Sequence, residues 1–186
     1  NFFVEDDIYN IESKGTFYRS RLTATQTEKK PSEFYQKAAC YIRDYFENNI
    51  EFPKLSEIHQ SFNNPAEAAN YIRKKWGLGN KPIPNMMRLL EEHGMVVYIA
   101  ENDSTKVNAH SGWIGVNHHM YFIVALDSNS NTFFNQQFSL AHELGHYVLH
   151  AGLNPQIVDK EEYRKMEQEA EEFASNFLLP AKEFSE

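Results

Sequence analysis

The segment from Phe138 to His150 constrains the fold of this chain more than any other part of the sequence. At about 100° per residue, its apolar side chains fall on one broad face of a helix: Leu140, Ala141, Leu144, Val148 and Leu149. The opposite stripe carries three histidines and one carboxylate: His142, Glu143, His146 and His150. A surface helix would ordinarily carry lysine, arginine or glutamine there. The segment therefore predicts a helix that is buried on one side and holds a cluster of metal-binding side chains on the other.

The pattern H-E-x-x-H at residues 142–146 predicts a zinc site. His142 and His146 lie about 40° apart around the helix, so both imidazoles can reach one tetrahedral ion. Glu143 points to the same side, where it is badly placed as a further ligand but well placed to accept a proton from a water molecule. We therefore expect zinc ligands at His142 and His146 and a general base at Glu143.

A catalytic zinc needs a third protein ligand and an open position for water. His150 lies about 80° from His142, so three histidines of one helix would bind one ion only with strain. The position six residues after His146 is Gly152, which excludes the ligand spacing of metzincins. The remaining source is a glutamate-rich helix expected at residues 160–179.

Glu169 is the candidate in that helix. On a helical wheel, Glu169 and Glu162 lie at the border of the apolar face, whereas Glu167, Glu171 and Glu172 point further away. Glu169 also lies in the middle of the helix, which would fix its position well. Periodicity alone does not separate this role from a place in a solvated run of glutamates.

The rest of the chain predicts an α+β protein with a small three-stranded sheet packed on helices and a helical N-terminal portion. Residues 1–30 show no sustained periodicity and are expected to form an irregular arm, followed by a single domain over residues 31–186. Further helices are expected from Ser32 to Phe46, from Pro65 to Trp76 and from Asn85 to His93, and strands at Met95–Ala100, Gly112–Val116 and Tyr121–Leu126.

Composition limits the environment and the partners. The 186 residues include 41% hydrophobic and 14% aromatic residues, which favours one folded domain over disorder. The net charge of −8 opposes direct binding of nucleic acid or anionic lipid by this chain. The single cysteine, Cys40, fits a reducing cytoplasm, and the longest apolar run, Tyr121–Leu126, is too short to cross a membrane. Because Asn1 is not a methionine, we expect the natural protein to begin further upstream.

The sequence resembles the ImmA/IrrE family of zinc-dependent metallopeptidases. The resemblance lies in His142-Glu143-Leu144-Gly145-His146 with Leu149-His150, in Glu169-Ala170-Glu171-Glu172-Phe173-Ala174, and in Leu178-Leu179-Pro180. The corresponding family patterns are HELGH…LH, E-A-N-x-F-A and L-L-x-P. Glu171 departs from the asparagine of the family pattern at this position.

The resemblance implies a zincin-like fold with zinc bound by His142, His146 and Glu169, and with Glu143 as the general base. It also implies a protein substrate, namely a helix-turn-helix repressor of a mobile element or a stress response, and a DNA-binding domain upstream of this chain. The alternatives are a catalytically silent regulatory module attached to such a domain, or a component of a toxin–antitoxin pair.

Two points of the mechanism remain open from the sequence. A substrate in extended conformation would pair with an edge of the sheet, for which the Ser111–Val116 strand is the candidate. The oxyanion needs a further hydrogen-bond donor, and the sequence does not choose among five candidates: His110, His118, His119, Tyr147 and His150.

Overall fold

The protein consists of helices packed on both faces of one mixed sheet. The computed structural model describes residues 11–18, 26–100, 109–127, 132–153 and 158–180. The strands are β1 (Ile11–Tyr18), β2 (Val96–Ala100), β3 (Ala109–Val116) and β4 (His119–Asp127). The helices are α1 (Gln26–Glu47), α2 (Pro65–Lys75), α3 (Met86–Glu92), α4 (Phe133–His150) and α5 (Lys160–Leu178). The predicted α+β class is confirmed. Among the described helices, none has the length and apolar character needed to cross a membrane.

The sheet has four strands in the order β1-β3-β4-β2. β3 and β4 form a tight antiparallel hairpin in which Val116 pairs with His119, and Asn117 in the turn has a φ of 51°. An asparagine suits this left-handed conformation better than most residues. β2 pairs with β4 in the parallel direction, because the chain crosses from β2 to the far side of β4 before it returns.

The prediction of three strands and an irregular arm over residues 1–30 was wrong in one respect. Residues 11–18 of this arm form β1, which pairs antiparallel with β3, and residues 26–30 belong to α1. The local sequence could not show this strand, since its pairing partner lies almost 100 residues further along the chain. Residues 1–10 and 19–25 of the predicted arm lie outside the described residues.

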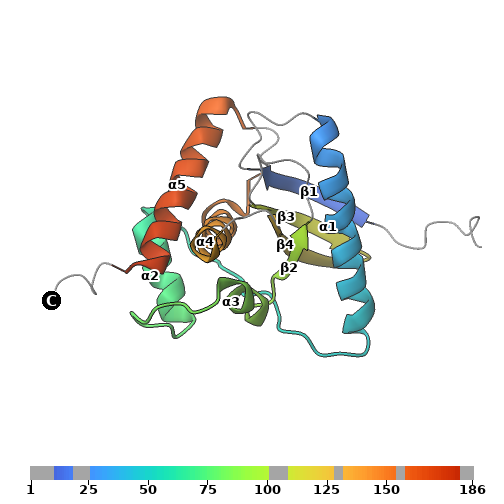
Figure 1. Cartoon of the computed structure of the whole chain (residues 1–186), viewed down its shortest axis with the longest axis horizontal. Helices are drawn as coiled ribbons and strands as arrows, with labels where there is room; N and C mark the ends of the chain where they lie inside the picture. Colours follow the sequence, from blue (N-terminus) through green and yellow to red (C-terminus); the bar gives the residue numbers. More distant parts are fainter. Residues whose placement is uncertain (1–10, 19–25, 101–108, 128–131, 154–157, 181–186) are drawn as a thin grey trace, which may run out of the picture.

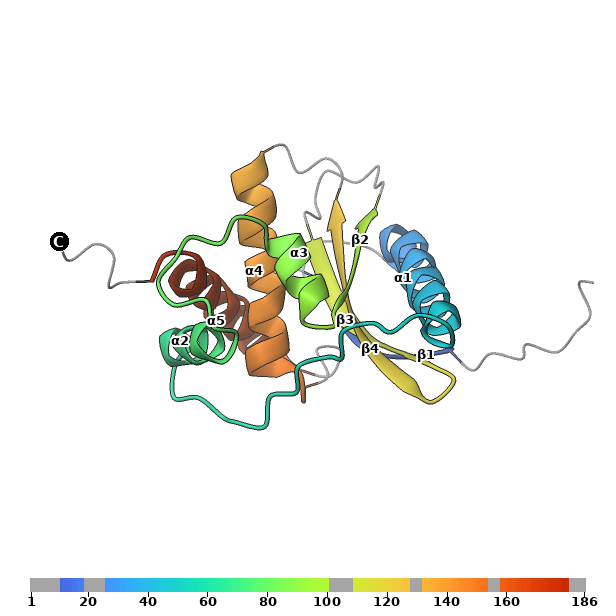
Figure 2. The ribbon, with the colours of Figure 1, turned by 90° about the horizontal axis from the view of Figure 1, so that it is seen from below.

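The two faces of the sheet are covered by different helices, as Figures 1 and 2 show. Along β4, Phe122, Val124 and Leu126 enter the larger core shared with α2, α3, α4 and α5. Tyr121 and Ile123 alternate with them and enter a smaller core with Cys40 of α1. This period of two is what a strand covered on both faces requires. In Figure 2, α4 lies next to the sheet, α5 and α2 lie beyond it, and α1 lies on the opposite side.

Polar residues fix α1 to the sheet. The Asp44 carboxylate is buried and accepts hydrogen bonds from Asn117 (2.7 Å), His119 (2.8 Å) and the Tyr121 hydroxyl (3.0 Å). Burial alone would raise the pKa of Asp44, but these hydrogen bonds outweigh it and lower the pKa below its ordinary value. The face of α1 that meets the hairpin is thus held by a charged hydrogen-bonded group as well as by apolar contacts.

Capping residues set the helix starts near the site. The Asn64 side chain accepts a hydrogen bond from the Glu67 N–H at 2.9 Å, which confirms the predicted start of α2. α4 begins at Phe133, five residues before the expected position, because Thr132 caps it by accepting a hydrogen bond from the Asn135 N–H. The extra turn leaves the H-E-x-x-H segment well inside the helix, where its geometry is regular.

Candidate metal centre

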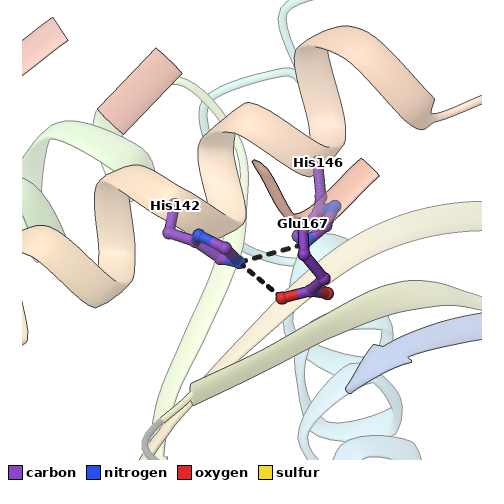
Figure 3. Close-up of side chains that lie close together, drawn as sticks. All are labelled: His142, His146 and Glu167. Carbon is purple, nitrogen blue, oxygen red and sulfur yellow. Dashed lines mark hydrogen bonds and ion pairs between the residues drawn. The ribbon is translucent and has the colours of Figure 1, made fainter. Parts of the chain in front are cut away.

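Two ring nitrogens of α4 converge at the centre of the molecule. His142 and His146 are each 1% exposed, and their Nε2 atoms lie 3.1 Å apart (Figure 3). Residues four apart on a helix lie one above the other on the same face, so the regular geometry of α4 produces this convergence. Two neutral imidazoles are ordinary zinc ligands, and the site brings them together as the sequence predicted.

Glu167 of α5 supplies a third group to the same point. Its Oε2 atom lies 3.4 Å from Nε2 of His142, and its Oε1 atom lies 3.4 Å from Nε2 of His146. Among the described residues, His142, His146 and Glu167 form the only group of three or more potential ligands that could hold one metal ion. Figure 3 shows the carboxylate directed at both rings.

The spacing of these three side chains fits a zinc ion. With bonds of about 2.0–2.1 Å and tetrahedral angles, two ligand atoms on zinc lie about 3.4 Å apart. The observed separations of 3.1 and 3.4 Å agree with this value. Nδ1 of His142 and Oε1 of Glu167 are buried and have no hydrogen-bond partner among the described residues, and the 3.4 Å contact of Oε1 is only an ion-pair distance. A cation at this point would compensate a carboxylate that hydrogen bonds alone leave incompletely satisfied.

The predicted third ligand, Glu169, does not belong to this group, and Glu167 lies in the position where Glu169 was expected. The Oε2 atom of Glu169 lies 3.0 Å from Nε2 of His150, and its Oε1 atom lies 3.7 Å from the ammonium group of Lys165. On the wheel of α5, Glu167 lies about 60° from Ala170, beside the buried Tyr163, whereas Glu169 lies about 100° away on the other side. The earlier placement of Glu167 away from the apolar face was therefore wrong.

Glu169 instead begins a chain of contacts that leads to His146. The Glu169 carboxylate can only accept, so Nε2 of His150 carries the hydrogen in their 3.0 Å contact. Nδ1 of a neutral His150 is then an acceptor for Nδ1–H of His146, which lies 3.2 Å away. This assignment places the acceptor lone pair of the His146 ring on Nε2, the atom that lies next to His142 and Glu167. The contacts thus select the tautomer of His146 that can bind a metal ion.

Glu143 lies in the same helix but makes different contacts. Its carboxylate is buried, and Oε2 accepts a hydrogen bond of 2.5 Å from the Ser111 hydroxyl of β3. Ser111 and Trp113 share the face of β3 that is turned to α4, since side chains two apart lie on the same side of a strand. Sequence analysis did not single out Ser111 for this role, because no local pattern connects it with a residue 32 positions away.

Burial and the contacts between the three side chains set the charges of the ligand group. It lowers the pKa of His146 to about 4, so the ring is neutral and able to bind a metal at neutral pH. Burial would raise the pKa of Glu167, but its interactions with His142 and His146 outweigh this and lower the pKa well below the ordinary value. The site therefore combines a neutral imidazole at His146 with an ionised carboxylate at Glu167, the forms in which these two groups bind zinc.

The five candidates for the oxyanion donor lie in different surroundings. The Tyr147 hydroxyl donates to the Ser56 carbonyl at 2.7 Å, and burial raises the pKa of Tyr147 to about 12. His119 contacts Asp44, and His150 contacts Glu169. His118 is in the exposed β3–β4 turn, and His110 is buried on β3 with its pKa lowered to about 4 by burial. None of these contacts identifies the donor.

The expected edge for an extended substrate is occupied. β3 pairs with β1 on one side and with β4 on the other. The prediction required the Ser111–Val116 strand to lie at an edge of the sheet, so it was wrong. Phe17 of β1 stands opposite Ser111 in the register, next to the residue that contacts Glu143. The described strands that end the sheet are β1 and β2.

A helix with H-E-x-x-H packed under a mixed sheet, with a carboxylate from the following helix, defines a metallopeptidase-like domain. The model of the peptidase M78 family, the IrrE N-terminal-like domain, matches residues 90–186, and the chain belongs to this family. The resemblance noted in the sequence is thereby confirmed. None of the curated proteins compared with the chain matches it.

Proposed function

We propose that this protein is a zinc-dependent endopeptidase. The observation that carries the proposal is the convergence of His142, His146 and Glu167 within 3.4 Å contacts, beside the buried carboxylate of Glu143. Three protein ligands leave a fourth tetrahedral position open, which distinguishes a catalytic zinc site from a structural one. The described residues offer no fourth carboxylate, cysteine or histidine to this group.

The roles of the side chains follow from their positions. When bound, zinc supplies Lewis-acid polarisation of a carbonyl group and increases the acidity of a water molecule. Glu143 accepts a proton from the attacking water and passes it to the leaving amine. The hydrogen bond from Ser111 holds one oxygen of this carboxylate and so helps to fix the orientation of the base. Glu169 and His150 keep His146 in the tautomer whose Nε2 carries the lone pair that can bind an ion.

Membership of the family supports a protein substrate, and we propose a helix-turn-helix repressor of a mobile element or stress response, cleaved in the cytoplasm. The net charge of −8 favours recognition of a protein over direct contact with DNA. A DNA-binding domain upstream of this chain is part of the same proposal.

The experiment compares the wild type with Glu143→Gln. The glutamine keeps the shape of the side chain but cannot accept the proton, so this variant should bind one zinc per chain and lose cleavage of a co-expressed candidate repressor. Zinc is measured by elemental analysis and cleavage by mass spectrometry of the products. Full cleavage by Glu143→Gln would remove the assignment of the base.

A second candidate is a catalytically silent regulatory module, including a component of a toxin–antitoxin pair. It is supported by the closure of the site, since His142 and His146 are each 1% exposed and β1 occupies the side of β3 beside Ser111. Stoichiometric zinc in the wild type without cleavage of any neighbouring repressor, together with an unchanged Glu143→Gln variant, would favour this candidate over the peptidase.

A further inference from the structure

The outer face of α1 is apolar, although it faces solvent. Six large hydrophobic side chains between residues 34 and 50 are 43–68% exposed: Phe34, Tyr35, Ile42, Tyr45, Phe46 and Ile50. We call these six residues the α1 face. The opposite side of the helix, which meets the sheet, includes the buried polar residues Gln36 and Asp44. The helix thus places several polar residues inside and most of its large apolar residues outside, the reverse of a surface helix.

The α1 face carries no charge within residues 34–50. The four charged residues of this stretch lie at least about 100° from Ile42 around the helix, toward the sheet: Lys37, Arg43, Asp44 and Glu47. A chain with a net charge of −8 repels another copy over most of its surface. Two copies can therefore approach through the α1 face without bringing like charges together.

The size of the α1 face suits a dimer. Six side chains of about 200 Å² each, about half exposed, present on the order of 600 Å² of apolar surface in total. This area is at the upper end of the range for the largest apolar patch on a monomeric protein. Two such faces in contact would bury about 1,200 Å², which reaches the lower limit of specific interfaces.

The order of residues along the face is self-complementary. If two α1 helices pack antiparallel about a two-fold axis at Ile42, Phe46 meets the partner's Ala38, and Phe34 meets the partner's Ile50. The large Phe46 then lies opposite the small Ala38 on each side of the axis, which favours close packing. Such a symmetric contact closes at two copies.

We propose that the α1 face is the interface of a homodimer in which two α1 helices pack antiparallel about Ile42. The dimer interface is independent of the proposed peptidase activity, because α1 and α4 lie on opposite sides of the sheet (Figure 2).

Light scattering coupled to size-exclusion chromatography tests the dimer with the full chain. The expected mass is twice the 21.7 kDa of one chain at high concentration, decreasing on dilution. Ile42→Lys places two ammonium groups at the axis and should weaken the dimer by about thirtyfold or more. Phe134→Lys is the matched control, because Phe134 is 80% exposed on α4 and should leave the dimer unchanged. A wild type that is monomeric at all concentrations, or a dimer insensitive to Ile42→Lys, overturns the proposal.

Disulfide formation tests the antiparallel direction. A mixture of Phe34→Cys and Ile50→Cys chains should form a covalent heterodimer, whereas neither variant alone should cross-link with itself. Cys40 does not compete, because it is fully buried and burial raises its pKa to about 12. Cross-linking of each variant with itself would indicate parallel helices and would overturn the proposed arrangement.

Discussion

Glu167 and Glu169 lie two positions apart on α5 and contact different histidines of α4. Glu167 approaches the two Nε2 atoms of the metal centre, and Glu169 approaches His150. One carboxylate is thus placed to bind the ion, and the other is placed to orient a residue that supports a ligand. The two can be separated experimentally because both replacements leave the apolar face of α5 intact.

Glu167→Ala should abolish stoichiometric zinc binding, since it removes one of three ligands. Glu169→Ala should retain one zinc per chain but weaken its binding by about 10- to 100-fold, the usual effect of losing a partner of a ligand. A competitive titration against a chromophoric chelator measures both. Glu172→Ala, at an exposed position of the same helix, is the control. Loss of zinc in Glu169→Ala with retention in Glu167→Ala would reverse the two roles.

The convergence of two histidines on α4 was predictable from the sequence, whereas the glutamate of α5 that meets them was not. The four-residue spacing of His142 and His146 fixes their geometry within one helix, so the pair was predictable. The third ligand depends on how α5 is rotated against α4, and several glutamates of α5 compete for that position. Glu167 lies on the same face of the helix as the buried Tyr163, Ala170 and Ala174. These apolar neighbours are the sequence signal that indicates an inward position for Glu167.

At the scale of elements, the contact between α4 and α5 decides whether the ligands meet. A Cβ atom built on Gly145 of α4 would lie 3.1 Å from Cα and 3.2 Å from O of Ala170, and 3.2 Å from Cδ1 of Phe173. These distances leave little space for a methyl group between the helices. Gly145 thus permits the close approach that brings Glu167 of α5 to the two histidines.

Gly145→Ala should push α5 away from α4 and weaken zinc binding. Overpacking costs about 1–3 kcal/mol, of which the better helix propensity of alanine offsets up to about 1 kcal/mol. The free energy of unfolding of the metal-free protein should therefore fall modestly, while zinc affinity falls as the carboxylate is displaced. Urea unfolding and zinc titration measure the two effects.

Gly152→Ala provides the comparison for this variant, because no atom of the described residues lies within 4 Å of a Cβ atom at Gly152. Gly152→Ala should change neither the free energy of unfolding nor the zinc affinity. Zinc affinity of Gly145→Ala equal to that of the wild type would show that the helix separation does not control the ligand distance.

Helices and strands were predictable where the residues that define them are close together in the sequence. The start of α2 at Pro65 and the strand at Tyr121–Leu126 depend on neighbours in the sequence, and both elements were predicted. β1 was not, because a strand is defined by its partner, and its partner β3 is remote. The spacing of Phe34, Ile42 and Phe46 predicted a helix correctly but could not show that these side chains face solvent.

At the scale of the whole molecule, the layers bury histidines on both sides of the sheet. His146 lies between the sheet and α5, and His110 lies on a strand covered by α1 and α4. Burial lowers the pKa of each to about 4, so neither ring is charged in the folded protein at pH 5. An unfolded chain holds the same rings in water, where the ordinary pKa is about 6.5.

This difference predicts that acid destabilises the metal-free protein well before its carboxylates titrate. Between about pH 6.5 and pH 4 the unfolded chain binds more protons than the folded one, so the free energy of unfolding falls as the pH falls. Each buried histidine should contribute a loss of about 2 kcal/mol between about pH 7 and pH 5. His110→Asn should remove the share of this pH dependence that comes from His110, while His146 and His150, whose pKa values burial also lowers, continue to titrate. Urea unfolding in the presence of a chelator measures the slope, and a free energy that stays constant over this range would contradict the burial of both rings. Added zinc should steepen the dependence in the wild type, since protonation of His146 competes with the ion for Nε2.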